Sequence, residues 1–467
     1  MTQFSRRNFL SAAGAGGLLA AIAPGTAWAA DTSGYKALVC ISLLGGMDHA
    51  DTILPTDQPS YDALYDTRSG ILDNYRSGVA PEDRLSRDID NLLPLSADNI
   101  ADYGGRTFGL PPQMSALHEL FERGDAAIIG NMGPLVQPVT RDEVNRRTVP
   151  DRLFSHNDQI STFLSLGPEG ARIGWGGRFV DALTAANSGD GAYSAISLAG
   201  FNVFLSGNQT RIFQINGGGP YPLTALNRRS FLGSGSDSSK ARRLMADHFS
   251  GAGVTSDNFY INDIADSQAR AATNITRYRE TLSSIYSFTT QFPRSPIGAQ
   301  LKNVAETISL RNQLGVGRQI FYCAIAGFDT HNDQANSLPA LQRQLSDALM
   351  AFQNAMAEIN ETNNVTTFTA SEFGRTTIGN GDGTDHGWGG HHFVVGGAVN
   401  GKRIYGDIPP YDLGLQTYLA SRGVLIPTLS VEQYAATLGA WFGLNPAELN
   451  EALPNLRNFD EANLGFV

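Results

Sequence analysis

Short apolar runs, each followed by a polar segment that contains glycine, recur along the chain. Four of them have the length of a β-strand and cover residues 37–44, 126–130, 318–327 and 364–370. Continuous apolar runs of this length are typical of strands that are buried on both faces, as in a parallel sheet. Residues 341–359, between the last two runs, instead carry apolar side chains at helical spacing. A strand, a helix and a strand in this order predict a right-handed βαβ unit and therefore an α/β fold.

Two further stretches, 298–314 and 430–444, have a helical pattern, and Ser430 is placed to cap the second helix. Residues 180–297 differ from the rest, because two short β-prone segments precede a glycine-rich turn and a polar, helix-prone stretch. We expect the two β-prone segments to pair antiparallel. The sequence thus predicts one domain over residues 30–467, in which 180–297 is an insertion or cap on the α/β core.

The first residues have the features of an export signal. The basic pair Arg6–Arg7 precedes a run of small apolar residues at 9–23, and a small-x-small cleavage pattern follows at 27–29. The context "SRRNFL" is typical of twin-arginine signals. The apolar run is shorter than the roughly 20 residues that span a bilayer. We therefore expect residues 1–29 to be a signal peptide for the twin-arginine translocase, and the mature protein to be periplasmic or secreted without a stable membrane span.

Composition excludes several classes of partner. The chain has a net charge of −11 at pH 7, so it lacks the basic surface that nucleic acid or anionic lipid requires. Hydrophobic residues make up 42% and charged residues 17%, which is typical of a globular protein. Both cysteines, Cys40 and Cys323, lie inside apolar runs. Export would permit a disulfide, but this position favours two free, buried thiols.

Polar side chains with metal-binding chemistry follow each of the four predicted strands. They are Asp48, His49, Asp51, Ser155, His156, Asp158, Asp329, His331, Asp333, Glu372, Arg375, Asp385, His386, His391 and His392. These segments hold six of the eight histidines of the chain. Ligands of α/β proteins bind at the carboxyl ends of parallel strands, so these side chains are expected to meet there. Carboxylate and imidazole groups together suit divalent cations such as zinc, manganese or iron.

Cleavage of phosphate or sulfate esters is the chemistry that needs such a set. Two metal ions about 4 Å apart can stabilise the attacking and the leaving oxygen of an in-line displacement. A hydroxyl group can act as the nucleophile, and an arginine can hold the non-bridging oxygens in a bidentate fork. Ser155 and Arg375 fit these two roles. Each motif alone also has a simpler structural interpretation; Ser155, for example, is placed to cap a helix.

Several segments resemble one large bacterial family of exported proteins, known mainly as a domain of unknown function within the alkaline phosphatase/sulfatase superfamily. The segments are "LLGGMDHADTILP", "LFSHNDQ", "GWGGR", "FDTHNDQ", "SEFGRT", "GTDHGWGGHHFVVGGAVNGKRIYG" and "EQYAATLGAWFGL". The resemblance extends from Lys36 to Asn458. It implies an alkaline-phosphatase-like α/β core with a mostly parallel sheet flanked by helices.

The resemblance also implies roles for individual residues. Asp48 takes the position of a carboxylate that binds one metal ion, and Asp329 and His331 resemble the ligand pair for the other. Ser155 takes the position of the nucleophile. The full set of candidate ligands for two divalent metal ions is Asp48, Asp329, His331, Glu372, Asp385, His386 and His391. We further expect the glycines of 381–390 to let that loop fold closely over the metal ions.

Two departures from the superfamily pattern leave alternatives open. Residues 371–373 replace an Asp-His pair, so His386 or His391 would have to supply the missing imidazole. The segment around Ser155 lacks the usual nucleophile signature, so Thr140 or a metal-bound water stays an alternative nucleophile. The resulting hypothesis is a metal-dependent hydrolase or transferase that acts on a small-molecule or polymeric phosphate or sulfate ester. The alternative is a non-catalytic exported scaffold or carbohydrate-binding protein that retains the fold.

Overall fold

The computed structural model describes residues 30–76, 86–145, 147–188, 191–216, 219–220, 240–241, 243–244, 247, 256–419 and 422–467. The twin-arginine signal predicted over residues 1–29 lies outside this part of the chain. Within the described residues, no helix is long and apolar enough to cross a bilayer.

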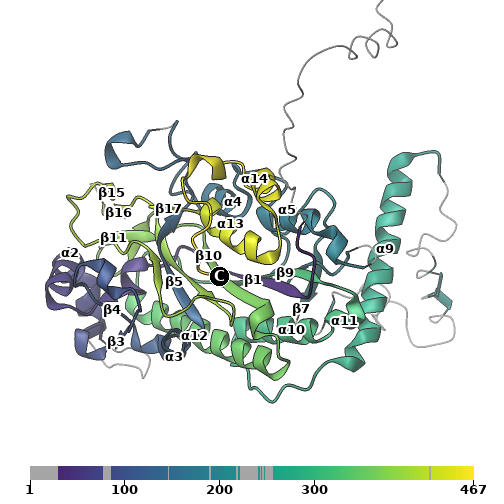
Figure 1. Cartoon of the computed structure of the whole chain (residues 1–467), viewed down its shortest axis with the longest axis horizontal. Coiled ribbons are helices and arrows are strands. Elements are labelled where there is room, and N and C mark those ends of the chain that lie inside the picture. The colour runs from purple at the N-terminus through teal and green to yellow at the C-terminus, as the bar shows by residue number, and fades with distance from the viewer. Residues whose placement is uncertain are drawn as a thin grey trace, which may run out of the picture.

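A mixed, mostly parallel sheet forms the centre of the molecule (Figure 1). Its strands run in the order β14-β5-β13-β10-β1-β9-β6-β7-β8, and β17 also pairs with β5. Their bounds are β1 (Lys36–Leu44), β5 (Ala126–Gly133), β6 (Ala195–Ser197), β7 (Phe213–Asn216), β8 (Gly219–Pro220), β9 (Arg318–Ala326), β10 (Val365–Ser371), β13 (Gly390–Val395), β14 (Ile404–Gly406) and β17 (Leu429–Ser430). Strand β1 lies at the middle, parallel to both β9 and β10, whereas β13 runs antiparallel to β10 and β5.

All four predicted strands are confirmed, as β1, β5, β9 and β10. The antiparallel pairing predicted within 180–297 is wrong. Strand β6 pairs parallel with β9, and β7 pairs parallel with β6, so both extend the central sheet. The connection between them, residues 198–212, is long enough for the dozen or so residues that a parallel crossover requires. Whether the rest of 180–297 acts as a cap stays a prediction.

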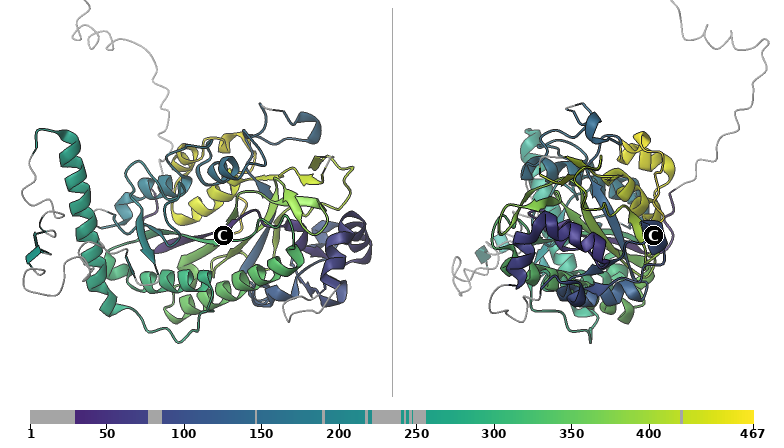
Figure 2. Two further views of the ribbon diagram at one scale, coloured as in Figure 1. Left: turned by 180° about the vertical axis from the view of Figure 1, so that it is seen from behind. Right: turned by 90° about the vertical axis from the view of Figure 1, so that its left-hand side faces the viewer.

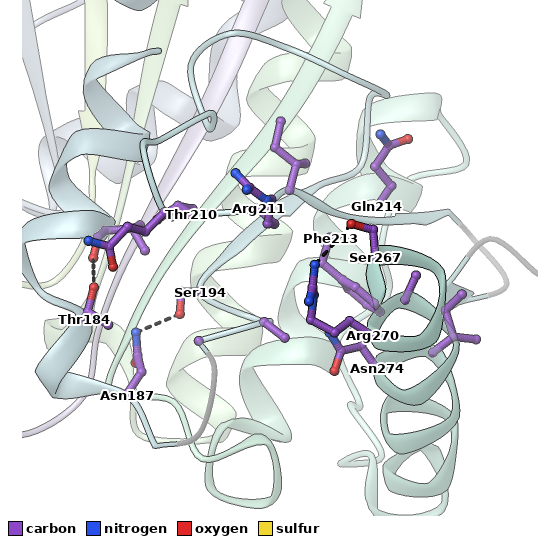
Figure 3. A pocket seen from close by; sticks show the side chains of 17 residues that line it. Thr184, Asn187, Ser194, Thr210, Arg211, Phe213, Gln214, Ser267, Arg270 and Asn274 are labelled. Carbon is purple, nitrogen blue, oxygen red and sulfur yellow. Dashed lines mark hydrogen bonds between the residues drawn. The ribbon is translucent and has the colours of Figure 1, made fainter. Parts of the chain in front are cut away.

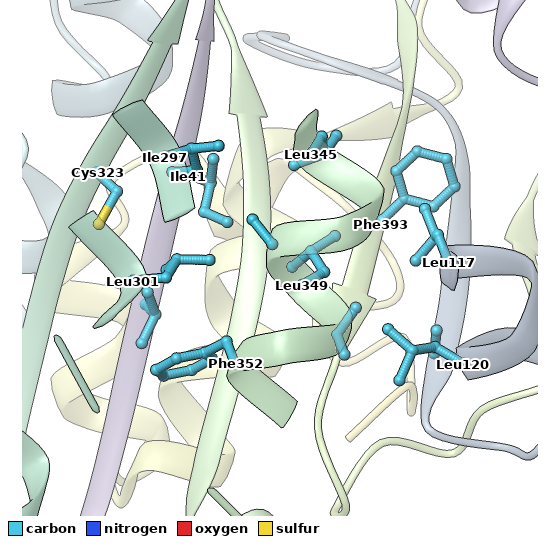
Figure 4. Packing of buried hydrophobic residues seen from close by; sticks show 14 of the residues in the cluster. Ile41, Leu117, Leu120, Ile297, Leu301, Cys323, Leu345, Leu349, Phe352 and Phe393 are labelled. Atoms are coloured by element: carbon cyan, nitrogen blue, oxygen red, sulfur yellow. The ribbon is translucent and has the colours of Figure 1, made fainter. Parts of the chain in front are cut away.

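Helices cover both faces of the sheet (Figures 1 and 2). Helices α3 (Ser115–Glu122), α10 (Pro296–Ser309) and α12 (Gln334–Glu358) lie on one face, and α4 (His156–Ser165), α5 (Trp175–Ala182), α13 (Val431–Phe442) and α14 (Pro446–Ala452) lie on the other. Alternate residues of β1 face the two sides: Val39 and Ile41 belong to one apolar cluster, and Leu38 and Cys40 belong to the other. Figure 4 shows Ile41 packed with side chains of α10 and α12. Burial on both faces explains why these strands are continuously apolar.

Smaller elements complete the structure. They are α2 (Gln58–Arg76), α9 (Phe259–Thr281), α11 (Arg311–Leu314), a three-stranded sheet of β2 (Leu54–Pro55), β4 (Phe108–Leu110) and β3 (Leu93–Pro94), and the pairs β11 (Arg375–Gly379) with β12 (Thr384–His386) and β15 (Tyr418–Leu419) with β16 (Val424–Leu425). The predicted cap at Ser430 is confirmed, because its side chain accepts a hydrogen bond from the Gln433 N–H. Cys40 and Cys323 are both free and buried, as expected, and they lie in the clusters on opposite faces of the sheet.

Candidate metal centre

Four side chains from three separate parts of the chain meet beyond the carboxyl ends of β9 and β10. His156 is the first residue of α4, Asp329 and His331 follow β9, and His386 ends β12. The Nε2 atoms of His331 and His386 lie 2.9 Å apart. Asp329 Oδ1 lies 3.1 Å from Nε2 of His331 and 3.3 Å from Nε2 of His386. The Nε2 atom of His156 lies 3.6 Å from Asp329 Oδ2, so three imidazoles direct the same ring nitrogen toward one carboxylate.

The other nitrogen of each ring has an acceptor. Nδ1 of His156 donates to Glu372 Oε1 at 2.7 Å, and Nδ1 of His386 donates to the Phe154 carbonyl oxygen at 2.7 Å. Nδ1 of His331 lies 3.3 Å from Asp385 Oδ1. An acceptor at Nδ1 places the proton of a neutral ring on that atom and leaves a lone pair on Nε2. Metal-binding histidines are typically oriented by this kind of hydrogen bond from the second ring nitrogen.

These residues fit a divalent cation. The Nε2 atoms of His331 and His386, 2.9 Å apart, are close enough to bind the same cation when neither nitrogen carries a proton. The ligand atoms of His156, Asp329 and His386 all lie within 4.8 Å of one another, and His331 Nε2 contacts two of these three residues. Imidazole and carboxylate ligands in this proportion suit zinc. The Asp329 side chain is 43% exposed, so the cluster is open to solvent on one side.

Buried groups set the charge of the cluster. Partial burial by itself raises the pKa of Asp329, but the hydrogen bond and positive charge of Arg375 outweigh it and lower that pKa. The Arg375 side chain is fully buried and donates to Asp329 Oδ1 at 2.7 Å, to the Gly45 carbonyl at 3.0 Å and to Thr384. The buried Arg375 side chain therefore holds Asp329 in place, and its predicted contact with substrate oxygens stays a prediction.

Two predicted ligands orient imidazoles instead. Glu372 is 5% exposed, and its Oε1 accepts hydrogen bonds from the Gly45 N–H and from His156. Burial raises the pKa of Glu372, while the contact with His156 acts in the opposite direction. Asp385 accepts from His331 and from Asn380 Nδ2, and the Asn380 contact is the main reason that the pKa of Asp385 is lowered. Both carboxylates thus contact the Nδ1 side of a ring, away from the convergence of Nε2 atoms.

Asp48 lies apart from the cluster and pairs with Arg68, so its role as a metal ligand stays a prediction. Its two oxygens accept hydrogen bonds from the Arg68 guanidinium at 3.1 Å and 2.5 Å, and Gln334 Nε2 donates to Oδ2 at 2.6 Å. The side chains of both Asp48 and Arg68 are fully buried. A guanidinium therefore neutralises the carboxylate that was expected to bind a metal ion.

His391 also lies apart from the cluster. Its Nδ1 accepts a hydrogen bond from the Asn131 N–H, and its ring packs edge-on against His49 at a centroid distance of 5.5 Å. The ring is buried, and this burial lowers the pKa of His391 well below its usual range. With Asp48 paired and His391 inside the core, the structure assembles one candidate metal site from the described residues, in place of the predicted two.

The predicted nucleophile lies beside the cluster. Ser155 is the N-cap residue of α4, immediately before His156, and its hydroxyl donates to Asp158 Oδ2 at 2.7 Å. The preceding residue, Phe154, has φ 74°, a backbone conformation that is uncommon for a residue other than glycine. The nucleophilic role of Ser155 stays a prediction. Thr140 forms a capping box with Glu143, which accounts for its hydroxyl in structural terms.

The loop after β11 approaches the site as its glycines predict. A Cβ on Gly383 would lie 2.4 Å from the Thr330 carbonyl oxygen and from the His331 backbone. Only a glycine therefore allows β12 to bring His386 against the residues that follow β9.

Sequence reasoning did not include His156 among the candidate ligands, although the structure places it in the cluster. The signal was present, because His156 follows a predicted strand like the other candidates, but the adjacent Ser155 drew the interpretation toward a nucleophile. Arg422 was also missed: its side chain is 69% exposed, and its Nη1 lies 3.6 Å from Asp385 Oδ2. A lone arginine in a polar loop carries no sequence signal for such a position.

Comparison with known proteins identifies the family. The family described as "Protein of unknown function (DUF1501)" matches residues 35–449, and the chain belongs to it. Among curated proteins, no sequence matches this chain. A solved structure of Ps i-CgsB in complex with k-i-k-neocarrahexaose has 8% identity and a TM-score of 0.35, with 92% of this chain and 77% of that chain covered. The PsFucS1 sulfatase from Pseudoalteromonas sp. has 9% identity and a TM-score of 0.34, with coverages of 93% and 72%. Both likenesses are distant.

Proposed function

We propose that this member of the DUF1501 family is a metal-dependent hydrolase or transferase of phosphate or sulfate esters. The observation that carries the proposal is the convergence of three Nε2 atoms on Asp329, with every Nδ1 held by an acceptor. Such preorganised rings are characteristic of metal sites, in which outer hydrogen bonds orient the ligands.

Each residue has a defined task in this proposal. His156, His331, His386 and Asp329 would hold one divalent cation. When bound, that cation supplies Lewis acidity and lowers the pKa of a water molecule that can serve as nucleophile. Arg375 keeps Asp329 ionised through a hydrogen bond of 2.7 Å. Ser155, next to His156, stays the candidate for a protein nucleophile.

Positive charge near the open side of the cluster favours an anionic substrate. The guanidinium of Arg422 is mostly exposed and lies beside Asp385, which in turn contacts His331. Arg152 is also exposed, but its guanidinium forms ion pairs with Asp158 at 3.6 Å and with Glu169 at 3.7 Å. Because exposed guanidinium groups bind phosphate and sulfate oxygens well, Arg422 is the candidate for binding the substrate anion. The predicted signal over residues 1–29 adds that the protein acts outside the cytoplasm after export.

The test combines metal analysis with turnover. The mature protein would be purified after its native export without added metal or chelator, and its metal content measured by mass spectrometry. We expect about one equivalent of zinc or a similar divalent metal per chain. The protein would then be assayed on p-nitrophenyl phosphate and p-nitrophenyl sulfate before and after removal of the metal by a chelator.

A pair of histidine variants provides the control. His386→Ala should lose the metal and the turnover, whereas His118→Ala should keep both, because His118 lies outside the cluster and contacts the Pro94 carbonyl. Full turnover in His386→Ala would contradict the proposed site. A stoichiometric metal with no turnover on any ester, including polymeric ones, would instead favour the exported scaffold.

A further inference from the structure

A cavity with both apolar and polar lining residues lies at the edge of the sheet, between α5, the approach to β7, and α9 (Figure 3). Its volume is about 620 Å³. Arg211, Phe213 and Gln214 come from the strand side, and Ser267, Arg270 and Asn274 come from α9. The volume falls within the roughly 300–1,000 Å³ that is typical of small-molecule sites.

The cavity is separate from the metal centre. Its lining includes Ser194, which directly precedes β6, and Phe213, which begins β7. It therefore lies at the amino ends of these two strands. The metal-centre residue Asp329 follows the carboxyl end of β9, and β6 runs parallel to β9. The two sites thus belong to opposite ends of the same parallel strands.

The charge of the lining is unlike that of the whole chain. The chain has 45 acidic and 34 basic residues, yet among the described residues that line the cavity there are two arginines and no aspartate or glutamate. Arg270 donates a hydrogen bond to Ser267 Oγ, and neither Arg270 nor Arg211 forms an ion pair with a described residue. The nearby Asp181 carboxylate accepts hydrogen bonds from Thr210 and forms no ion pair with Arg211. Two guanidinium groups that form no ion pair with a described carboxylate favour an anionic ligand, because they bind carboxylate, sulfate and phosphate oxygens in bidentate geometry.

The remaining polar side chains suit hydroxyl groups. Among the described residues, the amides of Gln214 and Asn274 have no side-chain hydrogen-bond partner, so both retain donors and acceptors for a ligand. Phe213 is partly buried, and its ring is held against Tyr193 and Tyr278 at centroid distances of 5.1 Å and 5.4 Å. A fixed ring beside free amides offers an apolar face together with hydrogen bonds, which is the combination that a sugar ring can use.

We infer that this cavity binds a sugar that carries an anionic group, namely a carboxylate, sulfate or phosphate. Arg211 and Arg270 hold the anionic group, Gln214 and Asn274 hydrogen-bond to the hydroxyls, and the site operates whether or not the metal centre is catalytic. It is a binding site distinct from the one proposed for ester cleavage.

Calorimetric titration of the mature protein tests the inference. The probes are galactose 6-sulfate, glucose 6-phosphate and glucuronate, with neutral galactose and inorganic sulfate as the comparison ligands. We expect at least one charged sugar to bind with a dissociation constant of about 1 mM or below. Galactose and inorganic sulfate should bind at least about tenfold more weakly, since each lacks one half of the recognised chemistry. The three charged probes show which anionic group is preferred.

Matched variants on α9 locate the binding. Arg270→Ala should weaken the binding of the charged sugar by about tenfold or more. Arg279→Ala removes an exposed arginine of the same helix that does not line the cavity, and it should leave the affinity unchanged. Thermal unfolding of both variants should match the parent chain, because both side chains are exposed.

Three results would overturn the inference. The first is the absence of heat with every charged sugar at about 10 mM. The second is an affinity for neutral galactose that equals the affinity for the charged sugars. The third is an equal loss of affinity for the charged sugar in Arg270→Ala and Arg279→Ala. The His386→Ala variant separates this site from the metal centre. Binding that is lost in His386→Ala but kept in Arg270→Ala would place the sugar at the metal centre and refute a second site, whereas the inference itself survives an inactive metal centre.

Discussion

Removal of the Asp48 carboxylate should destabilise the protein and leave its metal content unchanged. Burial alone raises the pKa of Asp48, but the charge and hydrogen bonds of Arg68 outweigh it and lower that pKa, so the pair is ionic. Both side chains are fully buried, and the shortest contact between them is 2.5 Å. In Asp48→Ala the guanidinium stays buried without its counterion. Breaking a buried pair in this way typically costs about 3–5 kcal/mol.

That cost converts into a measurable shift of the melting temperature. Proteins unfold with an entropy of roughly 2.1 cal/mol/K per residue, which amounts to about 0.9 kcal/mol/K for a chain of some 440 residues. A loss of about 3–5 kcal/mol therefore lowers the melting temperature by about 3–5 °C. Urea unfolding followed by circular dichroism gives the free energy of unfolding directly. The control is Asp73→Ala, which removes an exposed pair with Arg76 and should cost less than about 1 kcal/mol.

Metal content decides between the ion pair and the ligand role first predicted for Asp48. If Asp48→Ala loses its metal while its free energy of unfolding matches that of Asp73→Ala, Asp48 is a ligand and the ion-pair argument is refuted. A double replacement, Asp48→Leu with Arg68→Met, should recover most of the lost stability, because it leaves no unpaired buried charge.

Three further predictions concern other charged groups. Glu372→Gln should weaken zinc affinity by about 10–100-fold in a chelator competition, because the carboxylate that orients His156 is lost; unchanged affinity would contradict this role. Arg422→Ala should raise KM for a phosphate ester by roughly tenfold at low salt with little change in kcat, and an effect that persists unchanged at high salt would contradict electrostatic attraction. Burial raises the pKa of Glu432 from 4.5 to about 7, so its contribution to stability is full below pH 4.5 and is lost as pH rises through 7. Glu432→Gln should therefore reduce the fall in unfolding free energy between pH 5 and pH 8, by up to about 3 kcal/mol; urea titrations with identical pH profiles would refute it.

Local patterns in the sequence were sufficient for the elements of the core. The continuous apolar runs at β1, β5, β9 and β10 predict buried strands because each side chain must pack against a helix on one of the two faces. The cap at Ser430 depends only on residues three positions apart. Pairing between strands is different, because the parallel placement of β6 beside β9 joins residues far apart in the chain. The alternation of side chains along a strand shows which residues share a face of the sheet, but it does not show which other strand lies beside it.

The chemistry of the site divides in the same way. The sequence by itself determined that carboxylates and imidazoles follow the strands, since that depends only on residue type and position after an apolar run. Only the tertiary structure decided that His156 joins His331 and His386, while Asp48 pairs with Arg68 of α2. The physical reason is that a carboxylate becomes a metal ligand or an ion-pair partner according to which cation lies within about 3 Å of it, and that depends on how distant segments pack.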